Sequence, residues 1–490
     1  MIHVYTMVIY MYELADLKDI TNTIVFEEEP SIFTEDYASE FVETVLYLMD
    51  DFMRDNPNII TEPDFNEILL EEIKEIFYVQ FEEYIKNYDI VEGDISDDLE
   101  ELLEVAFNIY ITSFYPERSI FDSCVETSLL TEESINIIED KIQKLREIPQ
   151  PVQRTPEWYQ FRWNLITASN AYKAFGTQAT INQLIYEKCQ PLKTMNDDVE
   201  VKMVNTNTPL HWGQKYEPLT VLIYEHEYKT KVEDFGCIQH PVYKFIGASP
   251  DGIIVGNDSD RYGRMLEIKN VVSRDITGIP KKEYWIQMQL QMEVCDLDEC
   301  DFLETKFIEY TDSNAYHEDL IENSTTNNSQ NNCLTKDGKQ KGIIIYFHTK
   351  EGIPFYIYKP LDLIDSCQIQ EWEDNTVSLY QSDKYNYTFL KFIYWKVEVF
   401  SCVLVLRNKE WFKNSISQIE NVWKIIEEER ITGYTHRAPN KNVKKEVSKP
   451  VINIESSGCL LINKVIKVNN ENTINYTVFL NGSKFLFVEK

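Results

Sequence analysis

Ser249-Pro250-Asp251-Gly252 and Glu267-Ile268-Lys269 lie near the middle of this 490-residue chain, and together they indicate its central architecture. Short apolar runs flank residues 256–263, a polar stretch of the kind that connects two strands. Successive side chains of a strand point to opposite faces, so Glu267 and Lys269 share one face. We expect the hairpin to fold Asp251 back against that face.

Two carboxylates and one ammonium in such a position form a pattern typical of metal-dependent hydrolysis. Carboxylates supply the hard oxygen ligands that Mg²⁺ prefers, and the ion usually keeps several waters. Lys269 could orient or deprotonate the attacking water and offset charge in a phosphorane-like transition state. An isolated Glu-x-Lys pair is more often a surface ion pair, and the Asp251 turn upstream is what favours the metal site here.

The net charge of −35 is concentrated in one segment. Residues 1–150 contain 37 acidic and 8 basic residues, a net charge of −29, whereas the other 340 residues contain 45 and 39, a net charge of −6. Apolar residues recur with helical spacing in the first segment, for example at Phe41, Val45, Leu48 and Met49. We therefore predict an acidic helical N-terminal domain over residues 1–150. Such a surface could dock a basic partner or mimic a polyanion, or it could simply be solvated.

Composition also limits the class of protein. No apolar stretch approaches the ~20 residues that span a bilayer, and Met1–Tyr10 lacks the basic flank and cleavage pattern of a signal peptide. The nine cysteines include no C-x-x-C pair and no zinc-like spacing with histidine, which favours free thiols. These features predict an intracellular protein without a membrane partner.

Further candidate residues flank the central hairpin. Thr155-Pro156 predicts a helix start, and Arg162 and Ser169 after it could bind a phosphate, although a surface ion pair and a helix cap explain them equally well when taken alone. Glu217, in a helical run that we expect to begin near Trp212, could provide a third acid. In residues 284–292, helical spacing puts Tyr284, Gln287 and Gln291 on one face.

Five linked motifs over about residues 155–310 resemble the lambda-exonuclease-like YqaJ family of viral recombination nucleases, within the PD-(D/E)XK superfamily. They are Arg162 with Ile166-Thr167-Ala168-Ser169, Gly213-x-x-x-Glu217, Gly247-Ala248-Ser249-Pro250-Asp251-Gly252, Glu267-Ile268-Lys269, and Tyr284-x-x-Gln287-x-Gln289. The resemblance implies an α/β core, a mixed sheet flanked by helices. It also implies 5′-to-3′ digestion of duplex DNA with two Mg²⁺ or Mn²⁺ ions per site.

The resemblance also implies a role for each matching residue. Asp251, Glu267 and the backbone carbonyl of Ile268 would bind metal, and Glu217 would assist at the second ion. Lys269 would position the nucleophilic water and Gln287 would contact the site. The residues expected to contact the 5′-phosphate or the rest of the DNA are Arg162, Ser169, Tyr284 and Gln289. Since the core is nearly neutral, a local basic channel should hold the DNA, with candidates Lys202, Lys215, Arg274, Lys281 and Lys282.

We place the nuclease core at residues 151–360, with a polar insertion at 322–340. A helical extension at 361–430 should follow, because its aromatic-rich pattern, including Phe392–Glu398, suggests helix. Residues 431–490 should form a basic linker and a small β tail with an Asn481-Gly482 turn. The segments outside the core are foreign to the minimal phage enzyme, so the oligomeric state, including a homo-oligomer, stays open.

The sequence thus predicts a Mg²⁺- or Mn²⁺-dependent DNA exonuclease acting on double-stranded DNA with free ends, in recombination, repair or degradation of foreign DNA. Few glycines and many Asn, Ile and Tyr residues suggest an A+T-rich giant DNA virus, hence a viral replication compartment in the host cytoplasm. By family habit the partner would be a helicase or a single-strand annealing protein. Two alternatives remain: an endonuclease or resolvase of the same superfamily, and a non-catalytic protein acting through its acidic N-terminal domain.

Overall fold

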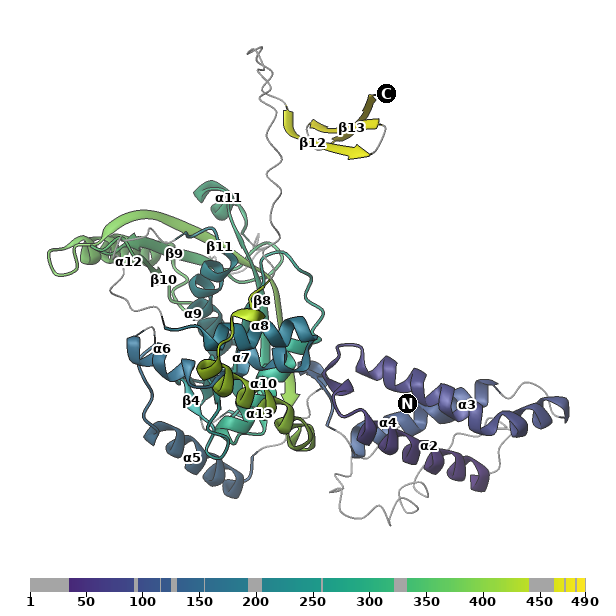
Figure 1. Ribbon diagram of the computed structural model, residues 1–490. Helices are drawn as coiled ribbons and strands as arrows, with labels where there is room; N and C mark the ends of the chain where they lie inside the picture. The colour runs from purple at the N-terminus through teal and green to yellow at the C-terminus, as the bar shows by residue number, and fades with distance from the viewer. Residues whose placement is uncertain are drawn as a thin grey trace, which may run out of the picture. The chain divides into compact units, whose positions relative to one another are not determined.

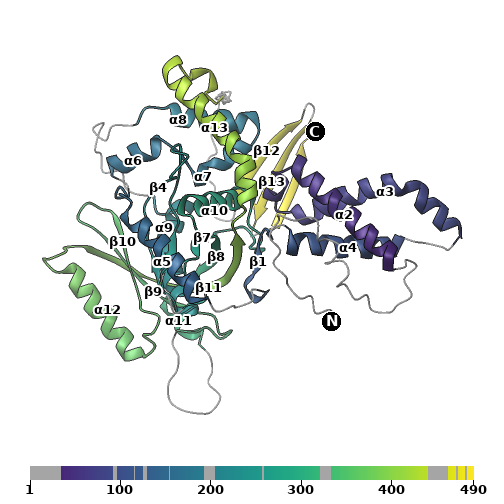
Figure 2. The ribbon, with the colours of Figure 1, turned by 90° about the horizontal axis from the view of Figure 1, so that it is seen from below.

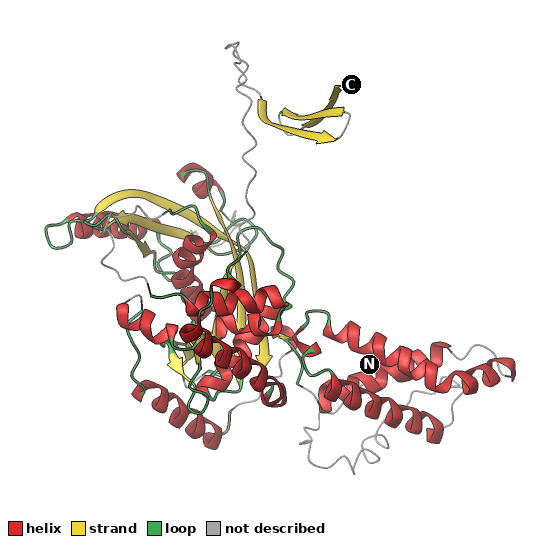
Figure 3. Ribbon diagram, in the orientation of Figure 1, coloured by secondary structure: helices red, strands yellow, loops and turns green. Residues whose placement is uncertain are grey.

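The computed structural model of the chain describes residues 35–91, 96–114, 116–124, 130–153, 155–192, 205–256, 259–320, 333–439, 462–470, 473–480 and 483–489. It separates into one compact unit that ends at Ala438 and another over Pro439–Lys490. None of the described helices is long and apolar enough to cross a membrane. Figure 3 shows that helices flank the strands of the first unit.

A mixed sheet forms the centre of the first unit. Within the described residues it has eight strands, ordered β10-β9-β11-β8-β7-β6-β3, with β1 paired to β11. Among these described strands, β7 and β8 pair in parallel and every other neighbouring pair is antiparallel. The bounds are β1 Ile120–Phe121, β3 Val232–Glu233, β6 Gly252–Ile254, β7 Met265–Asn270, β8 Glu299–Glu309, β9 Lys341–His348, β10 Pro354–Tyr358 and β11 Thr388–Leu406. The predicted mixed sheet is therefore confirmed.

Helices lie on both sides of the central strands (Figure 1), and Figure 2 labels α9, β7 and α10 beside one another. Leu266 and Ile268 pack with Tyr224 of α9 (Pro209–Glu227) in one apolar cluster. Met265, on the opposite face, belongs to the cluster that contains Trp285 and Met288 of α10 (Lys282–Cys295). α10 also provides the crossover that parallel pairing of β7 with β8 requires. The alternation along β7 thus directs Glu267 and Lys269 toward α10.

A smaller sheet leads the chain into the central hairpin. β5 (Ile246–Ala248) pairs in parallel with β2 (Ile166–Thr167) and antiparallel with β4 (Ile238–Gln239). Around it lie α6 (Pro156–Trp163), α7 (Ala168–Ala171), η4 (Tyr172–Phe175) and α8 (Gln178–Cys189). The predicted start of α6 is confirmed, because the Thr155 hydroxyl accepts a hydrogen bond from the Trp158 amide at 3.2 Å. β5 ends immediately before Ser249-Pro250-Asp251.

Helices dominate the described part of residues 1–150, as predicted. They are α2 Glu35–Asp55, η2 Ile59–Thr61, α3 Phe65–Val91, α4 Ser96–Ser113, η3 Asp122–Cys124 and α5 Glu132–Glu147. α2, α3 and α4 lie side by side (Figure 2), and residues such as Val45, Met49 and Phe77 are buried among them. The side chain of Arg118 donates to the carbonyl oxygens of Ile60 and Pro280 and so ties these helices to the start of α10.

The predicted helix around Phe392–Glu398 is wrong. These residues belong to β11, which pairs with β8 and β9 over 19 residues. Ile393, Trp395 and Val397 are buried whereas the residues between them are more exposed, a period of two that belongs to a strand. Their aromatic and β-branched side chains also favour a pleated surface. The helices of this region flank the strand, α12 at Ser366–Gln381 and α13 at Lys409–Thr432.

The remaining described elements are short. α11 (Ser313–Glu318) precedes the position of the predicted insertion, most of which (321–332) lies outside the described residues, and η5 spans Thr435–Arg437. The predicted Asn481-Gly482 turn, residues 440–461 of the basic linker and Lys202 also lie outside the described residues. In the second unit, β12 (Ile462–Asn470), β13 (Thr473–Leu480) and β14 (Ser483–Glu489) form an antiparallel sheet.

Candidate active site

The central hairpin holds Asp251 directly against β7. The backbone amide of Asp251 donates to the Leu266 carbonyl at 3.0 Å, and its carboxylate accepts from the Ile268 amide at 2.7 Å. Two hydrogen bonds to alternate residues of one strand leave the acid little freedom to rotate away. Asp251 therefore lies against the strand that carries Glu267 and Lys269, as the hairpin predicts.

Glu267 is fully buried and held by three donors. One carboxylate oxygen, Oε1, accepts from the Lys269 ammonium and from the Gln287 amide at 2.8 Å. The other, Oε2, accepts from the Gln291 amide at 2.7 Å. Gln291 also donates to the Ser249 carbonyl at 3.2 Å, so α10 braces both the acid and the turn before Asp251.

Negative charge exceeds positive charge in this cluster. Burial, together with the nearby charges of Glu267 and Glu217, raises the pKa of Asp251 well above its usual range, although Lys269 and the Ile268 amide oppose the shift. Burial lowers the pKa of Lys269, but the charges of Glu267 and Asp251 outweigh it and raise that pKa above its ordinary value. The charges of Glu267 and Glu217 both disfavour an ionised Asp251, and Lys269 alone opposes them with positive charge, so a bound cation would relieve the repulsion between these acids.

Glu217 comes from α9 on the other side of β7. Its charge adds to the effect of burial and of Glu267 in raising the pKa of Asp251, so Glu217 is within electrostatic reach of that acid. Asn270, at the end of β7, accepts from the Thr220 hydroxyl at 2.7 Å and donates to the Gly213 carbonyl at 3.3 Å. These bonds fix the turns of α9 on either side of Glu217. Because α9 begins at Pro209, Glu217 lies in its third turn and not, as expected, in its first.

The donor chemistry of the cluster fits a hard divalent cation. Asp251 and Glu267 offer carboxylate oxygens beside Ile268, and their excess charge would be offset by Mg²⁺ or Mn²⁺. Among the residues that the structure describes, no three His, Cys, Asp or Glu side chains are grouped closely enough to hold a metal ion on their own. A backbone carbonyl and waters would therefore have to complete the ligand set.

Tyr284 and Gln289, both expected to contact DNA, lie in different places. The Tyr284 ring faces the cluster, with the Lys269 ammonium 4.9 Å and the Arg274 guanidinium 5.7 Å from its centre. The structure corrects the expectation for Gln289. That side chain is fully buried, donates to the Leu406 carbonyl at 2.8 Å and accepts from the Asn408 amide at 2.7 Å, so it anchors the start of α13.

Gln291 is the residue at this site that the sequence motifs did not assign. It follows Gln287 by one helical turn, so the shared face noted in the sequence was a usable signal. The motif ending at Gln289 pointed instead to a residue on a different side of α10. This helix is buried on all sides from Met288 to Cys295. The position of a glutamine in the motif therefore does not tell which neighbouring element its side chain faces.

Arg162 lies near the turn that carries Asp251, and Ser169 follows β2, the strand paired with β5. Arg162 is stacked on the Trp158 ring at 4.6 Å. Burial raises the pKa of the Cys237 thiol, and the charge of Arg162 and a hydrogen bond with Ser249 oppose that shift, so Cys237 connects Arg162 to Ser249. Ser169 is exposed at the first turn of α7, with its hydroxyl 3.3 Å from that of Thr167.

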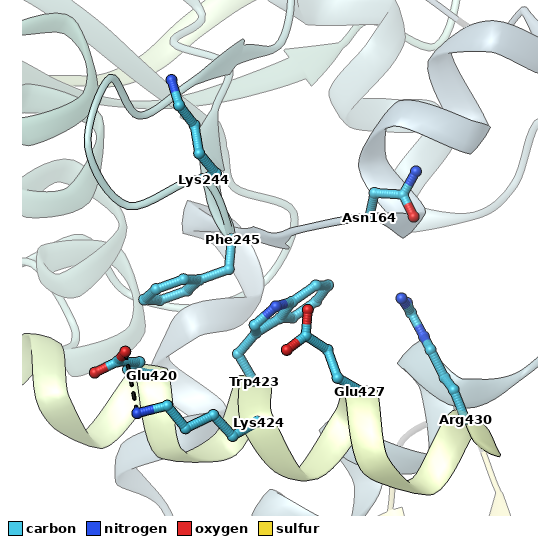
Figure 4. A pocket seen from close by; sticks show the side chains of 8 residues that line it. All are labelled: Asn164, Lys244, Phe245, Glu420, Trp423, Lys424, Glu427 and Arg430. Carbon is cyan, nitrogen blue, oxygen red and sulfur yellow. Dashed lines mark ion pairs between the residues drawn. The ribbon is translucent and has the colours of Figure 1, made fainter.

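A cationic cluster adjoins Arg162. The Arg430 guanidinium of α13 lies 3.5 Å from the Trp163 ring and donates to the carbonyl oxygens of Trp163 and Lys188. Burial, with the charges of Arg162 and Arg430, lowers the pKa of Lys188 to about 8. Figure 4 shows the neighbouring pocket of about 470 Å³, with the Trp423 ring between Phe245 and Arg430. Glu420 and Glu427 also line it, so its charge is mixed.

Most cations predicted for a DNA channel are paired with acids. Lys215 is buried against Glu309, Arg274 pairs with Glu304, and Lys282 pairs with Glu62 of the N-terminal helices. Lys281 is the residue before α10, at its N-cap. The sequence could not reveal these pairs, because each acid is distant from its cation along the chain.

Comparisons with known proteins agree with the motifs. An uncharacterized protein of Acanthamoeba polyphaga mimivirus is 30% identical over 318 residues, which are 58% of this chain and 54% of that protein. The chain thus spans about half the length of this curated relative.

Two solved structures resemble the chain at low identity. The alkaline exonuclease of Laribacter hongkongensis is 18% identical, with a TM-score of 0.31, and the match covers 56% of this chain and 94% of that one. A phage-related exonuclease from Haemophilus somnus is 14% identical, with a TM-score of 0.27 and coverage of 54% and 94%.

A family model provides the most direct assignment. The YqaJ-like viral recombinase domain matches residues 157–298, a range within the 155–310 that the motifs indicated. That range includes the hairpin, the Glu-x-Lys strand and α10. Residues 157–298, which hold Asp251, Glu267 and Lys269, thus match the model of the YqaJ-like viral recombinase domain.

Proposed function

We propose that this chain is a divalent-metal-dependent exonuclease that digests linear double-stranded DNA in the 5′-to-3′ direction. The observation that carries the proposal is the clamped cluster on β7: Asp251 bound to the Ile268 amide beside Glu267 and Lys269. A buried carboxylate held by two glutamine amides and an ammonium is costly to maintain for stability alone. Because the cluster lies within the range that matches the viral recombinase domain, a role in catalysis explains why such an arrangement is kept.

Each residue has a distinct role in this proposal. Asp251, Glu267 and the Ile268 carbonyl hold a Mg²⁺ or Mn²⁺ ion, and Glu217 serves a second ion. Bound there, such ions supply Lewis acidity and charge neutralisation at the phosphodiester. Lys269 orients the water and donates to developing negative charge. Gln287 and Gln291 keep Glu267 in place, so that it does not need to reorganise during the reaction.

Substrate capture depends on the cationic end of the site. Arg162 and Ser169 bind the 5′-phosphate of the degraded strand, with Lys188 and Arg430 raising the local positive potential. Tyr284 and Arg274 line the approach from α10. Such local charge is needed because the chain as a whole is strongly acidic and repels a polyanion at long range.

We further propose that the enzyme processes viral DNA ends in the replication compartment of a giant virus, in the host cytoplasm. It would work there with a single-strand annealing protein or a helicase. The similarity to a mimivirus protein supports the viral setting. Pull-down of tagged full-length chain from infected cells, with nuclease-treated lysate as control, tests whether a viral annealing protein or helicase accompanies it.

The activity is tested with end-labelled linear duplex DNA and the full-length chain. We expect stepwise shortening from the 5′ end in Mg²⁺ or Mn²⁺, none in a chelator, and none by Lys269→Met. Covalently closed circles should survive. Cleavage of those circles would replace the exonuclease by an endonuclease or resolvase, and shortening by Lys269→Met at the wild-type rate would remove the assigned site.

A further inference from the structure

A second pocket, of about 310 Å³, lies beside α9 and has no role in the proposal so far. Residues from α9, β8, β9, β10 and β11 line it, among them Trp212, Lys215, Glu309, Tyr346, Tyr356 and Lys391. Its volume is at the lower end of the roughly 300–1,000 Å³ typical of small-molecule sites. It can therefore admit one flat group of modest size.

The walls of the pocket are aromatic and held in place. The rings of Tyr346 and Tyr356 are stacked, with centroids 4.8 Å apart and an angle of 25° between planes. The Tyr356 hydroxyl lies 2.6 Å from Nε2 of His211, and the Trp212 ring packs on Tyr216 at 4.5 Å. Stacking surfaces that are fixed before a ligand arrives lose little entropy on binding.

The charge of the pocket is positive. Lys215 and Glu309 form an ion pair, and the Tyr216 hydroxyl also donates to Glu309, so this acid is already neutralised. Lys391 is exposed and forms no ion pair with any residue that the structure describes. Burial lowers the pKa of Lys215, Glu309 opposes the shift, and the charge of Lys391 adds to it. The indole N–H of Trp212 likewise has no acceptor among the described residues. An aromatic ligand that carries a negative group fits these features.

The pocket and the candidate catalytic cluster share α9. Lys215 and Glu217 are two residues apart, and the Tyr358 hydroxyl donates to the Lys215 carbonyl at 2.6 Å. Burial raises the pKa of both Tyr358 and Asp251, and the charge of Glu217 adds to each shift, so Glu217 lies within electrostatic reach of both. The pocket and the cluster thus use neighbouring positions of one helix, with Lys215 at the pocket and Glu217 on a different side of α9.

We propose that this pocket binds an unpaired nucleotide of the DNA substrate, with its base against Trp212 and Tyr356 and its phosphate at Lys391. The inference rests on the proposed nuclease function, and it adds a base-binding subsite to it. Aromatic side chains hold unpaired bases with little sequence preference, because every base has a π face. The subsite would keep a separated strand next to the reaction centre.

Binding in chelator, where hydrolysis does not occur, tests the subsite. The full-length chain is titrated into a fluorescent 12-nucleotide oligothymidylate and into a matched oligonucleotide with abasic residues, and anisotropy gives both Kd values. We expect the thymidylate to bind at least about fivefold more tightly, the lower end of what one stacked base contributes. Equal Kd values for wild type would overturn the subsite.

Two variants and one control locate the effect. Trp212→Ala should lose the preference for bases, and Lys391→Ala should weaken both oligonucleotides alike and reduce the salt dependence of binding. Lys384→Ala is the control, because Lys384 stacks on Tyr385 of the same extension and does not line the pocket. Retention of the full preference by folded Trp212→Ala overturns the proposal. If that variant does not fold, wild-type affinity and salt dependence in Lys391→Ala overturns it.

The same protein samples are assayed on linear duplex in Mg²⁺. Hydrolysis without any preference for bases would sink the subsite and leave the nuclease intact. A preference that depends on Trp212, in a chain that hydrolyses no DNA, would sink the nuclease and leave a nucleotide-binding pocket.

Discussion

Glu267 on β7 and Asp301 on β8 are both fully buried acids on neighbouring strands, yet their surroundings differ in charge. Asp301 accepts from Arg261 at 2.6 Å, from Arg264 at 3.2 Å and from the Tyr224 hydroxyl. Glu267 has one ammonium and two neutral amides, with two further acids nearby.

The difference separates an acid that stabilises the fold from one that serves chemistry. Two guanidinium groups contact the Asp301 carboxylate directly, and they also pair with Asp122 and Glu299, which are partly exposed to solvent. Glu267 instead has one ammonium and two neutral amides around it, and its charge raises the pKa of the neighbouring Asp251, so a bound cation would be stabilised there. Buried acids in this protein are therefore better distinguished by the charge that remains than by burial itself.

The largest effect is expected when the charge excess is removed. Asp251→Asn should reduce hydrolysis of linear duplex at least about 1,000-fold, equivalent to about 4 kcal/mol, because one metal-binding carboxylate is lost. Its melting temperature without metal should not fall, since like-charge repulsion is relieved. Steady-state rates and thermal unfolding in chelator measure both. Near wild-type hydrolysis would show that Asp251 is not a ligand.

The opposite result is expected at the balanced acid. Asp301→Asn leaves Arg261 and Arg264 buried without their partner, so the free energy of unfolding should fall by about 3 kcal/mol. Per folded molecule, hydrolysis should change little. Urea unfolding followed by circular dichroism gives the stability. A loss of activity in fully folded Asp301→Asn would break the comparison, because it would give both acids a chemical role.

Glu373 on α12 shows the effect of burial on an acid that lies outside the candidate active site. Burial, with the charge of Asp374, raises the pKa of Glu373 on α12 to about 7. Its folded-state pKa exceeds its unfolded value, so stability is highest below about pH 4.5 for this group and falls as pH rises toward 7. Glu373→Gln should raise the unfolding free energy by about 1–2 kcal/mol at pH 8 and not at pH 4.5. An equal gain at both pH values would assign the effect to packing.

The smallest effect is expected for the bracing amide. Gln291→Leu removes one donor from Glu267 and one from the Ser249 carbonyl, so kcat should fall about tenfold. KM for DNA should stay within about twofold, because Gln291 lies behind the acid. Gln289→Leu, which alters the anchor to α13, is the matched control and should affect stability more than kcat. A selective rise in KM for Gln291→Leu would instead indicate contact with DNA.

Local sequence signals predicted the parts of the fold that depend on near neighbours. The Thr155 cap, the hairpin from Gly252 to β7 and the helix after Lys281 all follow from spacing, turn residues and alternation within a few positions. Asp251, Glu267 and Lys269 were brought together because a hairpin makes distant positions adjacent in a predictable register. That is why the centre of the site could be located from sequence.

Features that depend on distant partners could not be predicted. The aromatic run of β11 is compatible with both helical and strand periodicity, and only its pairing with β8 and β9 decides for a strand. The direction of Gln289 depends on α13, more than 100 residues later. The pairing of Arg274 with Glu304 likewise depends on the register between β7 and β8.

Asn270 joins the strand that carries Glu267 and Lys269 to the helix that carries Glu217. Its single amide joins the end of β7 to α9 and, through the Thr305 hydroxyl at 2.6 Å, to β8. Any shift of α9 relative to the strand that carries Glu267 and Lys269 would therefore have to break or distort these hydrogen bonds. Asn270 therefore ties the position of α9, which lines the pocket, to the position of β7, which carries Glu267 and Lys269.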